Sequence, residues 1–282
     1  MALMPSHADA APHDRAAPLK VGIFDSGVGG LSVLRAVRAQ LPRAELLYAA
    51  DTGHAPYGDR SEEFVCDRSL RVARFLREQG AQIVVVACNT ATAAAVAALR
   101  ATWPELPLVG VEPGIKPAVA RSETRRIGVL ATTRTLASEK FRRLAEAHAD
   151  GATLVLQACP GLADAIEAAD AQGSGLDVLV ERYCAPLRAA RVDVAVLGCT
   201  HYPLAIDLFE RALPGVPLID TADAIARQTA RLAGEIDTTF VAPADDDTRP
   251  SVRAWSSGSP AALSAFARRW LALAVDAQEM RC

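Results

Sequence analysis

The sequence lacks an excess of charge of either sign, and this limits what the protein can bind. It contains 30 lysine and arginine residues against 33 aspartate and glutamate residues, which gives a formal net charge of −3. Proteins that bind nucleic acid or a membrane surface usually carry a basic excess on the binding face. We therefore expect no nucleic-acid partner and no membrane partner.

Long apolar runs are also missing. No stretch approaches the roughly 18 consecutive apolar residues of a membrane-spanning helix. The N-terminal residues, MALMPSHADAAPHDRAAP, lack the apolar core of a signal peptide, and we interpret 1–18 as a disordered extension. Without an export signal we expect a cytoplasmic protein whose thiols stay reduced.

The six cysteines are scattered along the chain, and no two of them form a CxxC pair. Zinc knuckles and thioredoxin-like redox pairs depend on such close spacing, so we predict no metal site. Four of the cysteines stand in no distinctive setting and are interpreted as structural: Cys66, Cys159, Cys184 and Cys282.

Short apolar segments alternate with helical patterns along most of the chain. Segments that are apolar throughout are typical of parallel strands covered on both faces. Eight short runs are candidate strands, and several of them are apolar throughout: 19–25, 45–51, 82–88, 106–111, 126–131, 153–159, 192–199 and 216–220. Helical patterns include 61–80, 221–235 and 259–273, and the acidic, turn-rich stretch 235–251 precedes the last of them. Repeated strand–helix units predict an α/β fold with parallel sheets.

The two halves of the chain resemble each other. VGIFDSG (21–27) resembles IGVLATT (127–133), and VVVACNT (84–90) resembles VAVLGCT (194–200). Both segments of the second pair are strands that end on a cysteine. This internal similarity predicts two like domains that face each other, with a ligand at the carboxyl ends of the strands.

Cys88 and Cys199 are the candidate catalytic residues. Each is predicted to precede a helix N-terminus, because Asn89 and Thr90 follow the first and Thr200 follows the second. The helix dipole favours a thiolate there, although a cysteine also commonly fills space in a core. Two opposed thiols suit the inversion of a stereocentre, in which a base acts on one face of a carbon and an acid on the other. Such a reaction needs no metal and no cofactor.

The loop FDSGVGGLS (24–32) resembles a dinucleotide-binding fingerprint, but its last position is Ser32 and not glycine. Asp51, at the end of the second strand, would imitate the ribose-binding acid in that interpretation. We interpret the loop instead as a tight turn that lets backbone approach a small ligand. A nucleotide-binding module remains the rival that is not an enzyme.

Three further features have two interpretations each. Asp25 either orients a substrate ammonium group or caps a turn. His201, two residues after Cys199, either tunes that thiol or is a surface or capping histidine. ADTGHAPYGDRS (50–61) is a loop over the site or a plain surface loop.

The motifs, taken in order, resemble those of the glutamate racemase family of bacterial cell-wall synthesis. The matching segments are VGIFDSGVGGLSVL, DTGHAPYGDRS, VVVACNTATA, GVEPGIKPA and LGCTHYPL, from Val21 to about Ala230. The resemblance implies an enzyme without a cofactor that interconverts L-glutamate and D-glutamate, a building block of peptidoglycan. It also implies two α/β domains related by a pseudo-twofold axis, with the substrate in the cleft between them. The first domain would comprise 19–111 and 219–274, and the second 112–218.

The resemblance also implies roles for individual residues. Cys88 would act on D-glutamate and Cys199 on L-glutamate. The positions that match substrate contacts in the family are Asp25, Ser26, Tyr57, Gly58, Asn89, Thr90, Thr200 and His201. Glu167 stands where the family has a glutamate that assists the histidine, although Asp164 makes this segment more polar than expected. The extension 1–18 and the acidic stretch 244–247 also depart from the family pattern.

The resemblance leaves the assembly and the substrate open in part. Family members pair in different ways, and a homodimer is one expected arrangement. An aspartate or other small-carboxylate racemase of the same fold is the nearest alternative. A cysteine hydrolase, which would use a single thiol with His201, is a different class of enzyme.

Overall fold

The computed structural model describes residues 18–168, 175–236 and 251–282. The predicted extension 1–18, apart from Pro18, lies outside the described residues, as does the acidic stretch 244–247. Within the described part of the chain, no helix is long and apolar enough to cross a membrane.

The strands form two separate sheets, as the internal similarity predicted. The first is a six-stranded parallel sheet in the order β10-β9-β2-β1-β3-β4. Its strands are β1 (Lys20–Asp25), β2 (Glu45–Ala50), β3 (Ile83–Val86), β4 (Leu108–Gly110), β9 (Val252–Ser256) and β10 (Gln278–Glu279). The second is a four-stranded parallel sheet in the order β6-β5-β7-β8. Its strands are β5 (Arg126–Ala131), β6 (Thr153–Ala158), β7 (Val194–Gly198) and β8 (Leu218–Ile219).

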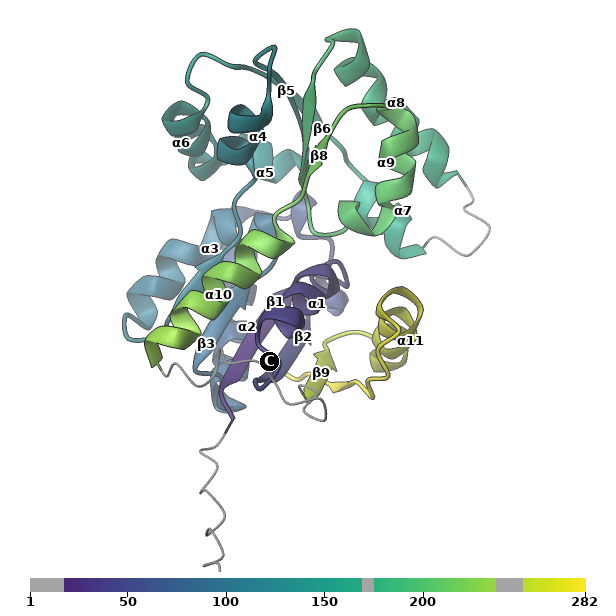
Figure 1. Cartoon of the computed structure of the whole chain (residues 1–282). Helices are drawn as coiled ribbons and strands as arrows, with labels where there is room; N and C mark the ends of the chain where they lie inside the picture. Colours follow the sequence, from purple (N-terminus) through teal and green to yellow (C-terminus); the bar gives the residue numbers. More distant parts are fainter. Residues whose placement is uncertain (1–17, 169–174, 237–250) are drawn as a thin grey trace, which may run out of the picture.

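Helices cover both faces of each sheet (Figure 1). Those packed on the first sheet are α1 (Leu31–Gln40), α2 (Glu62–Glu78), α3 (Asn89–Thr102), α10 (Ala222–Ile236) and α11 (Pro260–Leu271). Those around the second are α4 (Ile115–Arg121), α5 (Thr133–Ala137), α6 (Glu139–His148), α7 (Leu162–Ala168), α8 (Leu176–Ala189) and α9 (Ile206–Ala212). Three short 3-10 turns complete the pattern: η1 (Thr52–His54), η2 (Tyr57–Asp59) and η3 (Tyr202–Ala205). The predicted fold class, two parallel-sheet domains flanked by helices, is confirmed.

Alternating side chains divide β1 between two cores, which is why its residues 21–24 include no polar side chain. Val21 and Ile23 pack with residues of α1, α10 and α11. Phe24 points to the opposite face and packs with residues of α2 and α3. The burial of both faces explains the uninterrupted apolar pattern of the strand.

The two sheets share a strand order that brings the two cysteine-bearing segments to matching places. In the first sheet β1 lies between β2 and β3, and Phe24 is paired with Val86. In the second sheet β5 lies between β6 and β7, and Ala131 is paired with Gly198. The chain therefore leaves β3 beside the carboxyl end of β1 in the first sheet, and it leaves β7 beside the carboxyl end of β5 in the second.

The C-terminal strands β9 and β10 were not predicted. The helix α10, which precedes β9, and the helix α11, which lies between β9 and β10 in the chain, agree with the predicted 221–235 and 259–273. Because β9 pairs with β2, and β10 with β9, both strands extend the first sheet. The exact domain boundaries, 19–111 with 219–274 and 112–218, stay a prediction.

Candidate active site

Cys88 lies between β3, which ends at Val86, and α3, of which it is the N-cap residue. Its sulfur accepts a hydrogen bond from the Ala91 N–H at 3.4 Å, and the Ser26 hydroxyl lies 3.5 Å from it. The side chain is 6% exposed. The prediction took Asn89 and Thr90 as the cap residues, whereas in the structure Cys88 itself caps the helix and Asn89 and Thr90 begin it.

Burial opposes the thiolate that the helix N-terminus favours at Cys88. Burial raises the pKa of the Cys88 thiol to about 12, and the negative charge of Asp25 adds to this effect. The hydrogen bonds from Ser26 and Ala91 oppose the rise without cancelling it. Desolvation of a charged thiolate outweighs the helix N-terminus here, so Cys88 is a thiol at neutral pH and can act as an acid.

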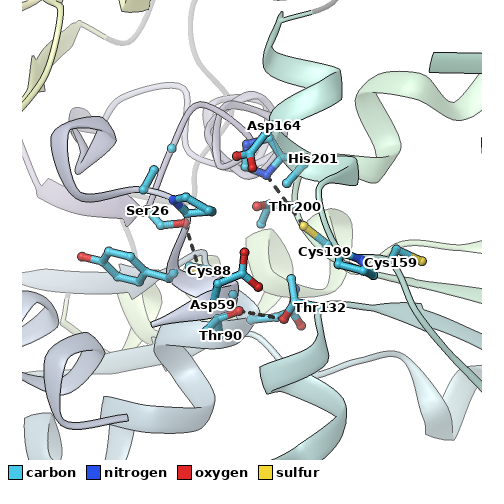
Figure 2. Close-up of a pocket in the computed structure, with 18 of the residues that line it drawn as sticks. Ser26, Asp59, Cys88, Thr90, Thr132, Cys159, Asp164, Cys199, Thr200 and His201 are labelled. Carbon is cyan, nitrogen blue, oxygen red and sulfur yellow. Dashed lines mark hydrogen bonds between the residues drawn. The ribbon is translucent and has the colours of Figure 1, made fainter. Parts of the chain in front are cut away.

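Cys199 follows β7, but its surroundings are not the mirror image of those of Cys88. The 3-10 turn η3 intervenes before α9 begins at Ile206, so the predicted helix N-terminus does not lie directly at this thiol. The Cys199 sulfur lies instead 3.7 Å from Nδ1 of His201. Figure 2 shows Cys88 with Ser26 on one side of the pocket and Cys199 with His201 on the other.

His201, which is buried, pairs with the partly exposed Glu167 behind Cys199. His201 Nε2 lies 2.6 Å from Glu167 Oε1. Burial lowers the pKa of His201, but the hydrogen bonds to Cys199 and Glu167 outweigh this effect and hold the pKa well above its usual value. Burial raises the pKa of Glu167, but its hydrogen bond to His201 lowers the pKa by more, so the net pKa lies below its normal value. The pair is therefore an imidazolium and a carboxylate, and the imidazolium can donate its Nδ1–H to the sulfur of Cys199.

Asp25 lies beneath the pocket wall. Its side chain is fully buried and accepts hydrogen bonds from the Gly27 N–H at 2.8 Å and the Thr200 hydroxyl at 2.9 Å. Burial raises the pKa of Asp25. Through the Thr200 bond this residue joins the two sheets, and it orients a hydroxyl that does line the pocket.

The glycine-rich loop approaches the other domain more closely than the prediction suggested. A Cβ atom at Gly27 would lie 2.1 Å from Glu167 Oε1, and one at Gly29 would lie 2.5 Å from His201 Nδ1. Glu167 Oε1 also accepts a hydrogen bond from the Val28 N–H at 3.0 Å. Gly27 borders the pocket, but the main reason for these glycines is the packing of the loop on the histidine and the glutamate.

The remaining predicted residues lie around the same pocket. The Tyr57 hydroxyl donates to Asp51 Oδ2 at 2.6 Å, so the phenol end of Tyr57 points away from the pocket. Gly58 packs against Thr132, and the Thr90 hydroxyl lies 3.0 Å from that of Thr132. These contacts join the loop 50–61 and α3 to the start of α5 in the second domain.

Asn89 presents an unused acceptor at the N-terminus of α3. Its side chain is buried, and its Oδ1 has no hydrogen-bond partner within the part of the chain that the structure describes. A buried polar atom without a partner costs free energy, and it is a sign of a ligand position when it borders a pocket.

The pocket encloses about 630 Å³ of space between atoms, part of which opens to solvent. Both candidate thiols line it, and among its described lining residues there is neither lysine nor arginine. The lining residues are Ser26, Gly27, 55–59, 88–90, Thr132, Thr133, 159–161, Ala163, Asp164, Glu167 and 199–201. Elsewhere too, the described ranges 18–168, 175–236 and 251–282 contain no cluster of three or more side chains able to hold a metal ion.

Sequence reasoning missed several lining residues. Cys159 was interpreted as structural, yet it borders the pocket beside Cys199 (Figure 2). Burial raises its pKa to about 12, so it is a neutral thiol there. Thr132 could have been found, because it follows β5 as Ser26 follows β1 in the internal similarity. Asp164 was noticed only as an unusual residue, and no sequence signal indicated that it borders the pocket.

The nucleotide-binding interpretation of Asp51 is wrong. Its carboxylate is fully buried and accepts hydrogen bonds from Arg68 and Tyr57. An acid that is shielded from solvent and already bonded to an arginine is not available to a ribose.

Comparison with known proteins connects this geometry to a family. A family model described as Asp/Glu/Hydantoin racemase matches residues 31–229. The chain is 48% identical over 239 residues to the glutamate racemase of Ectopseudomonas mendocina (strain ymp), covering 84% of this chain and 89% of that protein. It is 50% identical over 213 residues to the glutamate racemase of Pseudomonas aeruginosa, covering 75% of this chain and 80% of that protein.

Solved structures resemble the fold over almost its whole length. The glutamate racemase isoform RacE1 from Bacillus anthracis superimposes with a TM-score of 0.83 at 31% identity, covering 93% of this chain and 97% of that one. The Escherichia coli glutamate racemase, solved in complex with L-glutamate and the activator UDP-MurNAc-ala, superimposes with a TM-score of 0.77 at 31% identity. The coverage is 93% of this chain and 98% of the E. coli chain.

Proposed function

The chain belongs to the family described as Asp/Glu/Hydantoin racemase, and we propose that it interconverts L-glutamate and D-glutamate by proton transfer between the substrate and the thiols of Cys88 and Cys199. The product D-glutamate would supply peptidoglycan synthesis. The observation that carries the proposal is the pair of thiols, one from each sheet, that line a single pocket with different polar partners.

The two thiols begin the reaction in different protonation states. The His201 imidazolium donates toward Cys199 and so stabilises a thiolate, whereas burial keeps Cys88 protonated. With L-glutamate bound, the Cys199 thiolate takes the α-proton and its electron pair stays on the α-carbon. Cys88 then delivers its S–H proton to the opposite face of that carbon. D-glutamate leaves behind a Cys199 thiol and a Cys88 thiolate, and the reverse direction starts from that state.

Removing an α-proton requires stabilisation of the negative charge that spreads onto the α-carboxylate. Neutral donors provide it in this proposal, since the lining residues that the structure describes include no lysine or arginine and the His201 imidazolium is directed at Cys199. We place the α-carboxylate at the N-terminus of α3, with the Thr90 hydroxyl and the Asn89 amide as donors. Hydrogen-bond donors fixed before the reaction, in a pocket with little water, stabilise a developing anion strongly.

The second carboxylate of glutamate belongs, in this proposal, on the side of the pocket that Gly58 and Thr132 form. Gly58 and Thr132 face each other there from different domains. Contacts on this side determine whether glutamate or the shorter aspartate is accepted, because one methylene changes the distance between the two carboxylates.

The setting of the reaction is also part of the proposal. All six cysteines are free in the structure, as a mechanism that depends on reduced thiols requires, and we place the protein in the cytoplasm. We expect two copies to associate as a homodimer, which light scattering of the purified protein would test.

Replacement of each thiol tests the mechanism. We expect Cys88→Ala and Cys199→Ala to lose racemisation of both enantiomers by about a thousandfold or more, since each removes an acid or base that contributes about 10²–10⁴-fold. The assays are optical rotation and incorporation of deuterium at the α-carbon in D₂O, with a panel of glutamate, aspartate and other small amino acids.

The matched control is Cys184→Ala. Cys184 is as buried as the two candidates but lies among apolar residues away from the pocket. It should retain racemisation. Full activity of either Cys88→Ala or Cys199→Ala would refute the proposal, and a preference for aspartate would reassign the substrate.

A further inference from the structure

A buried carboxylate organises the wall of the pocket from behind. Asp51, which follows β2, is fully shielded from solvent. Its two oxygens accept hydrogen bonds from Arg68 Nε at 3.0 Å and Arg68 Nη2 at 2.9 Å. The hydroxyls of Tyr57, at 2.6 Å, and Ser257, at 2.7 Å, donate to the same carboxylate. One side chain thus joins β2, α2, the loop 50–61 and the end of β9.

This arrangement determines what Tyr57 presents to the substrate. Since its hydroxyl is held by Asp51, the residue offers its backbone and ring to the pocket, together with Gly58. The position of this wall therefore depends on the position of the Asp51 carboxylate. That carboxylate in turn depends on Arg68, its bidentate partner, because a buried anion without a counter-charge is strongly unfavourable.

Arg68 has a second partner on its other side. Its Nη1 donates to the carbonyl oxygen of Cys282 at 2.9 Å, and its Nη2 lies 3.5 Å from the Cys282 sulfur. The segment Gln278–Cys282 is itself docked. β10 pairs with β9, the Met280 N–H donates to Ser256 O at 2.8 Å, and the Met280 side chain is buried in the core that also contains residues of α2.

We propose that Arg68 is a positioning residue for the reaction, which couples the docking of the segment Gln278–Cys282 to the Tyr57–Gly58 wall of the pocket through Asp51. This inference rests on the proposed function, in which that wall contacts the end of glutamate remote from the α-carbon. Displacing the wall weakens substrate binding more than proton transfer, because the two thiols stand on other elements.

Arg68 suits this role for a geometric reason. The guanidinium makes two parallel bonds to one carboxylate while a further N–H reaches Cys282, so a shift of either neighbour moves the other. It is only 6% exposed. A lysine at the same place keeps the charge but has no planar fork, and it cannot make both sets of contacts at once.

Two variants separate this role from plain stability. The first is Arg68→Lys in the full chain. The second ends the chain at Met280, which removes the Cys282 contacts but leaves the buried Met280 side chain in place. For both we expect KM for glutamate to rise about tenfold while kcat changes by less than about threefold, since the loss falls on binding shared by ground state and transition state.

Arg71→Lys is the matched control. Arg71 lies on the same helix and forms an exposed ion pair with Asp67 at 2.8 Å, away from the pocket. It should leave both KM and kcat unchanged. Combining Arg68→Lys with the shortened chain should raise KM no further than either change alone, because both act through one contact.

The outcomes separate the two levels of inference. Unchanged KM in a folded Arg68→Lys protein overturns the positioning role. If circular dichroism shows that this variant is unfolded, the KM of the shortened chain decides in the same way. A loss of kcat with unchanged KM also overturns the positioning role.

Titration calorimetry with D-glutamate measures the same effect as a rise in Kd. The positioning role is therefore tested even if the wild-type protein fails to racemise glutamate. That failure would refute the proposed function alone.

Discussion

Replacing Glu167 with glutamine removes one charge from the contact between the two domains while keeping the shape of the side chain. Glu167 Oε1 accepts a hydrogen bond from the Val28 N–H at 3.0 Å and lies 2.6 Å from His201 Nε2. An amide oxygen can keep the Val28 bond. The substitution therefore alters the charge balance at His201 more than it alters the fold.

The expected magnitude follows from the state of His201. Burial lowers its pKa, but the hydrogen bonds to Cys199 and Glu167 raise the pKa well above normal. The imidazolium is therefore present at pH 7 and is lost only as the pH rises through this raised pKa. A hydrogen bond to a charged group contributes about 1.5–3 kcal/mol. Without it we expect kcat/KM for glutamate to fall about 10- to 100-fold at neutral pH, and the basic limb of the pH profile to move to lower pH.

The assay is the pH dependence of kcat/KM from about pH 6 to pH 9, measured for both enantiomers by circular dichroism. Both directions must show the same loss, since the equilibrium constant of a racemisation is one. Glu146→Gln is the matched control, because Glu146 is an exposed residue of α6 that pairs with Arg142. A Glu167→Gln protein with the wild-type rate and pH profile would show that the imidazolium is not needed.

Three further predictions test the packing between the domains and the buried carboxylate. Gly29→Ala places a Cβ atom 2.7 Å from the backbone nitrogen of His201; we expect a stability loss of about 1–3 kcal/mol, seen as a lower Tm, with a raised KM for glutamate. Thr132→Val removes the hydroxyl that lies 3.0 Å from Thr90; urea denaturation should show a loss of about 1 kcal/mol, and no loss would mean that this bond contributes nothing. Although burial raises the pKa of Asp51, its hydrogen bonds lower that pKa below normal. The stability that the ionised Asp51 provides is present above the unfolded pKa of about 3.9 and is lost as the pH falls through the folded pKa. The Tm of the wild type should therefore drop below about pH 4, and the Tm of Asp51→Asn should show less of this drop.

Much of the fold could be predicted because several strands, such as β1, β3 and β7, are buried on both faces. The eight apolar segments all became strands, and α2 begins after Ser61, whose hydroxyl accepts a bond from the Phe64 N–H at 3.2 Å. β9 could not be found in the same way. Val252–Ser256 is short and contains Arg253, so its strand conformation depends on pairing with β2.

The candidate site was predictable where its residues belong to one local motif. Asn89 and Thr90 follow Cys88 at the start of α3, and a capping pattern is visible in a few consecutive residues. Cys159 and Asp164 were missed as pocket residues, because no local pattern distinguishes a cysteine in a core from one at the edge of a cavity. Only the packing of α7 against the first domain brings this segment to the pocket.

The sequence by itself determined which strands end on a thiol, which helix is capped beside one, and that two similar halves carry these features. Those properties depend on neighbours within a few residues, where hydrophobic period and capping chemistry act. The tertiary structure alone decided that Glu167 reaches Val28 and His201, and that Cys88 is held as a neutral thiol. Burial and electrostatic interaction arise from groups that come together only on folding, so proton affinities in the pocket belong to the assembled domains and not to any short segment.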